Sequence, residues 1–486
     1  MKKSLKIILQ FSILLSSFLG IFCYVNGSTE VPSVISTNTT WNKVNSPYDL
    51  RGPVLVNEGV VLTIEPGTIV NLFGYYILVN GTLEAKGTEA NQISINSGSI
   101  HFSETSTDWN EDLGNGCIIE NSILDSVELA IDNSPKIHMN SINSLNIRGS
   151  PEISKNRISG EINISGSPII KDNIVTNAIP ASIIITRGSP IISNNTISCR
   201  LLITNGSPII SNNILGDGVH IDAHGGEVTI IDNFVYTRGT YDTIFVQSSS
   251  AIISNNTITG NNDDGIYLSG PYSFFVSYNN ISNCVTAISA NNPCPLVLQW
   301  NLIQNNNDGI RIFINEEVYA PFEGIWKKPV DFPLIITNNQ ISDNIGTGIV
   351  FNHPIASIMN NSIYDNDVGI KIQELSDASN LSIVFNNIYA NNYNIKLDSK
   401  PNISVSNNWW GTTDITEINQ TIYDFKYDFN LGSINFVPIL RTVNVEIPEF
   451  PSWTILLMSV LLTLAVIFSK NRLDKHNKSE KQKENH

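Results

Sequence analysis

Charged side chains are scarce in this 486-residue sequence, at 15% of all residues, against about a quarter in ordinary soluble domains. No segment between the two ends keeps a helical period of apolar residues. An architecture of charge-laced helices is therefore excluded. Asn, Ser, Ile and Gly are conspicuous instead, and a hydrophobic fraction of 41% leaves ample material for a core. The composition favours a structure held together by stacked apolar and amide side chains.

Basic residues are especially few in the body of the chain. Once Lys2, Lys3, Lys6 and residues 470–486 are left out, 19 basic residues stand against 41 acidic ones. A surface of this sign repels nucleic acid. No DNA or RNA partner is expected.

Cysteine and the metal-binding residue types are also sparse, with 5 Cys, 4 Met and 7 His and no CxxC pair or His-rich tract. No cofactor is predicted, because neither calcium nor copper has a specific motif here. Cys284 and Cys294 are close enough in sequence to form a disulfide in an oxidising compartment. The spacing alone does not decide whether these two residues are free thiols or form a disulfide.

The two ends predict export and membrane anchoring. Residues 1–27 read as a signal peptide, with three lysines ahead of an apolar run; an uncleaved anchor is the alternative. Residues 453–469 are uninterruptedly apolar, enough to cross a bilayer core of about 30 Å. The basic tail, residues 470–486, is then cytoplasmic by the positive-inside rule. The body is expected at the cell surface, outside the membrane.

A short motif precedes the predicted span, within a linker over residues 441–452. Pro448-Glu449-Phe450-Pro451-Ser452, with the span and the tail, resembles the PEF-type C-terminal sorting signal of archaeal surface proteins. The resemblance implies processing by an archaeosortase. A retained transmembrane helix is the plainer alternative.

An irregular repeat fills the body, after a lead-in over residues 28–49. Gly-Ser-Pro recurs at Gly149, Gly166, Gly188 and Gly206, each time followed by an Ile-rich strand and an Asn. The series of corner residues is Asn156, Asn173, Asn195, Asn213, Asn233, Asn256, Asn280, Asn301, Asn339, Asn361, Asn387 and Asn408. Alternating strands such as Ile266/Leu268 lie between them. Repeats too short to bury their own apolar face are stable only when stacked.

These coils resemble the right-handed parallel β-helix repeats of NosD-like and pectate-lyase-like proteins. The entry Glu65-Pro66-Gly67-Thr68 and the exit Asn408-Trp409-Trp410-Gly411 are similar to the first and last coils of such proteins. The resemblance implies an all-β, right-handed parallel β-helix over residues 50–440, followed by one transmembrane helix. It is specific for fold and weak for activity.

Two chemistries suggested by the resemblance find little support in the residues. Asp263-Asp264-Gly265 looks like the paired acids of polygalacturonases, yet Asn307-Asp308-Gly309 repeats it at the same place in a later coil. A motif that recurs as a turn is interpreted as a turn, so no catalytic residue is predicted. His220, Asp222 and His224 are weak candidates for a metal site, since one strand cannot close a metal site alone.

The outward positions offer a contact surface. One face combines His220, Phe245 and Tyr267 with Arg311, and with Lys371 and Lys396 further along. Aromatic faces and spaced cations suit a sugar polymer; the alternative is an ordinary solvent-facing surface without a ligand. Beside Arg311, residues 315–333 form an unusually long insertion. Its predicted contact residues are Tyr319, Phe322 and Trp326. Arg311 and this insertion are expected to form one cleft. Alternatively, the insertion only covers the flank of the β-helix.

The resulting expectation is a non-enzymatic, membrane-anchored extracellular β-helix protein that binds surface glycans or envelope proteins, or is a structural surface component. Asn-x-Ser/Thr triplets, for example at Asn38 and Asn380, make it a candidate glycoprotein. One alternative is a carbohydrate-active enzyme, a polysaccharide lyase or hydrolase. The other is a NosD-like factor for copper-site maturation.

Overall fold

A computed structural model describes residues 28–176, 182–222, 226–237, 242–260, 262–315, 320–322, 325–327, 332–375, 378 and 380–445. The chain forms two compact units, Met1–Ala178 (unit 1) and Ile179–His486 (unit 2). Each unit is a stack of parallel coils, and each coil contributes strands to three columns. The predicted signal peptide, membrane span and basic tail lie outside the described residues. Within the described part, no helix is long and apolar enough to cross a membrane.

A short helix, η1 (Lys43–Asn45), lies among the first coils of unit 1. Its first column is β3 (Thr39–Trp41), β6 (Val61–Ile64), β9 (Thr82–Lys86), β11 (Ile118–Glu120), β13 (Lys136–His138), β16 (Glu152–Ser154) and β19 (Ile169–Lys171). Its second is β1 (Thr29–Glu30), β4 (Tyr48–Asp49), β7 (Ile69–Asn71), β14 (Ser141–Ile142), β17 (Arg157–Ile158) and β20 (Ile174–Val175). Its third is β2 (Val34–Ile35), β5 (Val54–Val56), β8 (Tyr76–Val79), β15 (Ser144–Ile147) and β18 (Ile162–Ile164). The long strands β10 (Ile93–Phe102) and β12 (Ser122–Ile131) run through the second and third columns.

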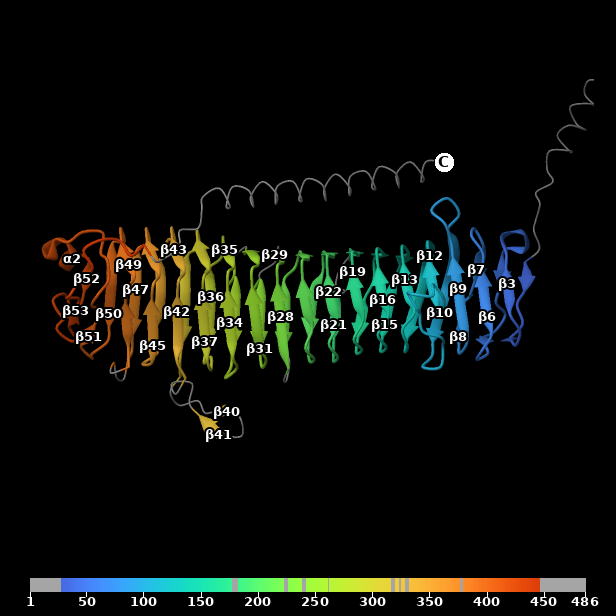
Figure 1. Ribbon diagram of the computed structural model, residues 1–486, viewed down its shortest axis with the longest axis horizontal. Coiled ribbons are helices and arrows are strands. Elements are labelled where there is room, and N and C mark those ends of the chain that lie inside the picture. Colours follow the sequence, from blue (N-terminus) through green and yellow to red (C-terminus); the bar gives the residue numbers. More distant parts are fainter. Residues whose placement is uncertain are drawn as a thin grey trace, which may run out of the picture. The chain divides into compact units, whose positions relative to one another are not determined.

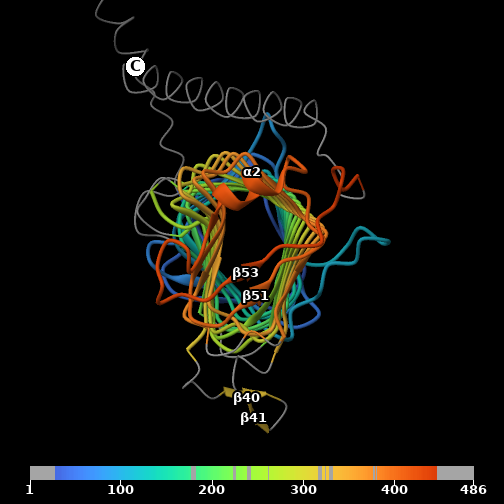
Figure 2. The same cartoon turned by 90° about the vertical axis from the view of Figure 1, so that its left-hand side faces the viewer.

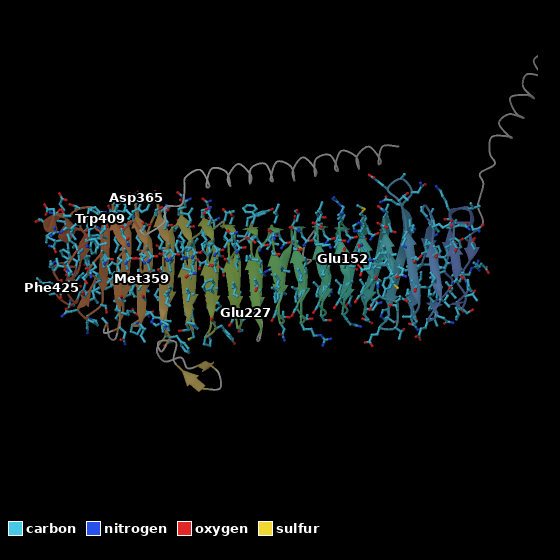
Figure 3. The ribbon with its side chains drawn as sticks, in the orientation of Figure 1. Glu152, Glu227, Met359, Asp365, Trp409 and Phe425 are labelled. Atoms are coloured by element: carbon cyan, nitrogen blue, oxygen red, sulfur yellow. The ribbon has the colours of Figure 1, made fainter. Side chains whose placement is uncertain are left out.

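Unit 2 repeats the arrangement (Figure 1, green to red). Its first column is β22 (Ile191–Ser193), β25 (Ile209–Ser211), β28 (Glu227–Ile231), β31 (Ser250–Ser254), β34 (Phe274–Ser277), β37 (Leu296–Gln299), β42 (Leu334–Thr337), β45 (Ala356–Met359) and β48 (Ser382–Val384). Its second is β23 (Thr196–Ile197), β26 (Ile214–Leu215), β29 (Phe234–Tyr236), β32 (Thr257–Thr259), β35 (Asn280–Ser282), β38 (Leu302–Gln304), β43 (Gln340–Ser342), β46 (Ser362–Tyr364) and β49 (Asn387–Tyr389). Labels on Glu227 and Met359 mark first-column strands in Figure 3.

The third column of unit 2 carries the candidate site described below. Its strands are β21 (Ser182–Ile185), β24 (Arg200–Ile203), β27 (Val219–Asp222), β30 (Ile244–Gln247), β33 (Ile266–Ser269), β36 (Thr286–Asn291), β39 (Asp308–Phe313), β44 (Thr347–Phe351), β47 (Val368–Gln373), β50 (Tyr393–Asp398) and β52 (Ile422–Tyr423). Helix α2 (Ile415–Gln420) and the pair β51 (Ile403–Ser404) and β53 (Ile434–Asn435) lie at the C-terminal end of the unit (Figure 2).

The core is made by like residues in register. Ile244 pairs with Ile266, and Ile266 with Ile288 on the next coil. All three side chains are fully buried. Burial of each such side chain contributes about 2–3 kcal/mol, and alternation sends the residues between them to the outer face. The predicted β-helix and its inward Ile positions are confirmed.

A buried ladder of amides follows the first-column strands from β13 onward. Asn233 Nδ2 donates to Asn256 Oδ1 over 3.1 Å, and Asn256 Nδ2 donates to Asn279 Oδ1 over 3.0 Å. The residue before each ladder Asn has a positive φ; Tyr278, for example, has a φ of 57°. The prediction was wrong by one residue at two corners, where Asn279 and Asn386 occupy the ladder in place of Asn280 and Asn387. In each of these Asn-Asn pairs the first residue, not the second, follows the left-handed position.

The recurring Gly-Ser-Pro turn has a steric cause. A Cβ added to Gly166 would lie 2.0 Å from the backbone oxygen of Gly149 on the coil before it. A Cβ on Gly206 would lie 2.3 Å from the oxygen of Gly188. The coils approach so closely at this corner that only glycine fits.

Two further expectations have a structural outcome. Cys284 and Cys294 are buried thiols, so the disulfide is absent from the described part of unit 2. Within the insertion, β40 (Ala320–Phe322) and β41 (Ile325–Lys327) form an antiparallel hairpin, a local pairing that the sequence analysis did not predict. Tyr319 lies outside the described residues.

Candidate functional site: the outer face of unit 2

Three aromatic rings stack on the outer face of the third column. His220, Phe245 and Tyr267 occupy one register position in β27, β30 and β33. The ring centroids of His220 and Phe245 are 4.4 Å apart and those of Phe245 and Tyr267 are 5.2 Å apart, with interplanar angles of 6° in both pairs. Strand alternation puts all three outside, and parallel pairing stacks them face to face. We call these three residues the ring column.

Stacking changes what the ring column offers to a ligand. Both faces of Phe245 are covered by its neighbours, contrary to the expectation that each ring presents an open face. Tyr267 is different, because its partner on the following coil is Ser289, whose side chain is too short to cover a ring. The hydroxyl of Tyr267 accepts a hydrogen bond from Asn291 Nδ2 over 2.8 Å. The Tyr267 ring is thus held in place by Asn291, and among the described residues of unit 2 only Phe245 stacks on it.

Arg311 follows Ser289 in the same register position. The step from Tyr267 to Arg311 is two coil spacings, roughly 10 Å. The Arg311 guanidinium pairs with Asp308, three residues before it on β39. Ser289, between the ring and the guanidinium, is only 7% exposed.

The other predicted cations lie further along the column and are engaged within the unit. Lys371 Nζ lies 3.1 Å from Asp398 Oδ2. Lys396 Nζ lies 4.9 Å from the centroid of the Tyr423 ring. All three predicted cations are thus engaged within unit 2: Lys371 with a carboxylate, Lys396 with a ring and Arg311 with Asp308.

Three aspartates gather at the corner that leads into β30 and β33. Burial, together with the charge of Asp263 and a hydrogen bond to it, raises the pKa of Asp242 to about 7. Burial also raises the pKa of Asp264, against the opposing hydrogen bonds from Thr286 and Ser289. We call Asp242, Asp263 and Asp264 the acid group.

The acid group and the ring column adjoin each other. The side chain of Ser289 hydrogen-bonds to that of Asp264, and the charge of Arg311 lowers the pKa of Asp264. Asp308 and Arg311, at the corresponding positions two coils later, form an ion pair. Tyr267, Arg311 and the carboxylate of Asp264 therefore surround the buried Ser289.

The structural role predicted for the repeated Asp-Gly motif agrees with its contacts. Asp264 Oδ1 accepts a hydrogen bond from the backbone N–H of Thr286 over 3.1 Å. Asp308 Oδ1 accepts one from Thr347 N over 2.7 Å. Both aspartates tie their turn to the next coil. Asp242 was missed by the sequence analysis, although it precedes Ile244 by two residues, as Asp264 precedes Ile266.

His220 is placed poorly for a metal. The guanidinium Nη2 of Arg200 lies 2.6 Å from His220 Nδ1; since a guanidinium only donates, Nδ1 accepts and its lone pair is occupied. The described residues contain no group of three His, Cys, Asp or Glu side chains arranged for a metal ion. His224 lies outside the described residues, and for Asp222 only the backbone position is described. The same holds for Phe322 and Trp326, so the cleft between Arg311 and the insertion stays a prediction.

The fold and this geometry define a β-helix repeat protein, and a family model agrees over part of the chain. Residues 198–324 match the family model "Right handed beta helix region". Similar solved structures are two mutants of the periplasmic alginate epimerase AlgG, at 15% and 14% identity, with TM-scores of 0.37 and 0.35. Each match covers 69% of this chain and 84% of the other. No curated protein matches the sequence.

Proposed function

We propose that unit 2 binds a surface polysaccharide on its outer face, between Tyr267 and Arg311. The observation that carries the proposal is the register Tyr267–Ser289–Arg311, which sets a small residue between a ring and a guanidinium. Two coil spacings, roughly 10 Å, accommodate one pyranose ring between two flat groups. The sugar's C–H face packs on Tyr267, and its hydroxyls bond to Arg311 and Asp264.

The proposed setting is the outside of the cell, on an exported and membrane-anchored chain. Its support comes from the sequence: the apolar N-terminal run, residues 453–469 and the basic tail. A glycan-binding coil stack held at the membrane would contact polysaccharides or glycosylated envelope proteins.

The test is to fill the site, with a thermal melt of each variant to check that the coils stay folded. In Ser289→Phe the new ring continues the ring column and stacks on Tyr267. We expect affinity for the polysaccharide to fall at least about fivefold, and also in Tyr267→Ala, since an aromatic contact contributes about 1 kcal/mol or more. Tyr389→Ala is the control, because it removes a ring stacked on Tyr364 at 5.2 Å on a different column. Affinity electrophoresis of full-length protein against a polysaccharide panel gives the measurement. Equal binding by wild type and Ser289→Phe would refute the site.

A second candidate function is acid–base catalysis on the bound chain, favoured by the raised pKa of Asp242. One observation weighs against ordinary glycoside hydrolysis. Asp242 and Asp263 are hydrogen-bonded to each other, whereas the two catalytic carboxyls of glycosidases stand about 5 Å apart or more. Polysaccharides incubated with wild type and Asp242→Asn decide between the two: reducing or unsaturated ends released by wild type alone would establish catalysis.

A further inference from the structure

Unit 1 contains a pocket of about 650 Å³ at the corner between its first and second columns. One side is the turn after β9, with Thr88, Glu89 and Gln92. The other side is the corner itself, where Met139, Lys155 and Arg157 line the pocket. The volume is typical of a small-molecule site.

The cations of the pocket differ from the other cations of unit 1. The described part of that unit holds eight Lys and Arg residues, and five of them pair with carboxylates: Arg51, Lys86, Lys136, Arg148 and Lys171. Lys43 donates to Asn91 Oδ1 over 3.1 Å. Of the eight Lys and Arg residues in the described part of unit 1, only Lys155 and Arg157 have side chains without an ion pair or hydrogen bond. Both line the pocket.

The backbone fixes these groups on one wall. Met139 and Lys155 occupy left-handed corner positions, with φ of 55° and 56°, and Arg157 pairs in register with Ser141 at the start of the second column. Met139 is 43% exposed, a large apolar side chain facing solvent beside two cations. On the other side, Asn121 Nδ2 donates to Gly87 O over 3.3 Å and ties the turn to the corner.

We propose that this pocket binds an acidic saccharide, its carboxylate held by Arg157 and Lys155 and its ring packed on Met139. Arginine matches a carboxylate with two parallel N–H donors. Gln92, Thr88 and Ser141 offer partners for hydroxyl groups. Glu89 brings a negative charge to the turn, so the site favours a ligand with one carboxylate near the cations and hydroxyls near the turn. A nucleotide is disfavoured, because none of the residues that line the pocket is aromatic.

The experiment uses full-length protein carrying Ser289→Phe, so that binding at unit 2 is already blocked. Trigalacturonate is titrated by calorimetry, with neutral cellotriose and inorganic phosphate as comparison ligands. We expect trigalacturonate to bind more tightly than either, and Arg157→Gln and Lys155→Gln each to weaken it about tenfold or more. Arg148→Gln is the matched control, since Arg148 pairs with Asp132 and does not line the pocket.

The outcomes separate this site from the one proposed in unit 2. Loss of binding in Arg157→Gln with retention in Arg148→Gln supports the pocket. Unchanged binding in both cation variants overturns it, whatever the result for Tyr267. Equal affinity for phosphate overturns the saccharide specificity, and equal affinity for cellotriose overturns the role of the carboxylate. A thermal melt of each variant checks that the coils stay folded.

Discussion

At the scale of single residues, the amide ladder shows what a repeat pattern predicts and what it misses. The spacing of Asn residues predicts a corner ladder, and most of its members are confirmed. It does not choose between Asn279 and Asn280, because both fit the pattern. The choice is made by backbone conformation: Tyr278 takes the left-handed position, so Asn279 enters the ladder and bonds to Asn301 over 3.0 Å. A ring residue with positive φ is uncommon, so the sequence alone does not favour it.

Asp242 carries a prediction at the same scale. Its pKa is about 7 in the folded protein and near 4 in an unfolded chain. Between these values the folded state binds more proton than the unfolded state, so stability falls as pH rises through this window. Thermal melts at pH 5 and pH 8 measure the effect: the melting temperature of wild type is expected to fall more than that of Asp242→Asn. An equal fall in both proteins would show that Asp242 titrates normally.

At the scale of strands and coils, the alternation of apolar and polar residues correctly predicted which side chains face inward and which face outward. The inward Ile residues and the outward position of Phe245 and Tyr267 follow from it, and both are as expected. The prediction that sugar rings stack on these aromatic faces overlooked that the rings of successive coils cover one another. Alternation places a side chain outside but does not indicate what the next coil places over it. The acid group and the unit 1 pocket were not predicted. Each joins residues from several coils, such as Gln92 with Arg157, at positions that the repeat leaves variable.

The close approach of successive coils gives a prediction for unit 1. A methyl group at Gly166 would meet a backbone oxygen at 2.0 Å, whereas nothing lies within 4 Å of one at Gly52. Gly166→Ala must push two coils apart and break their pairing, and we expect a loss of about 3 kcal/mol or more. Gly52→Ala is the matched control and is expected to be neutral or slightly stabilising. Urea unfolding followed by hydrogen exchange of β16 and β19 measures both; similar midpoints would contradict the steric argument.

At the scale of the whole molecule, the last described residues indicate where unit 2 passes into the predicted anchor. Asn444 does not continue the stack but binds back on its flank: its N–H donates to Asn387 Oδ1 over 2.8 Å, and its Nδ2 donates to Phe385 O over 2.7 Å. Leu440, Thr442 and Val443 line a cavity of about 430 Å³ there with Phe385. The last described residues therefore lie along the corner between the first and second columns of unit 2.

The contacts of Asn444 make the anchoring prediction more specific, because they show where a deletion can begin. Deletion of residues 446–486 keeps the Asn444 contacts and removes the apolar segment, so the shortened protein is expected to fold and to appear in the medium. Deletion of residues 470–486 alone keeps the span and is expected to leave the protein in the membrane fraction after a carbonate wash, since about 17 to 25 apolar residues suffice to cross the bilayer.

Protease added to intact cells should digest unit 2 in the full-length protein, because the positive-inside rule places it outside. Full-length protein recovered in the soluble fraction, or protected from protease, would contradict the proposed topology.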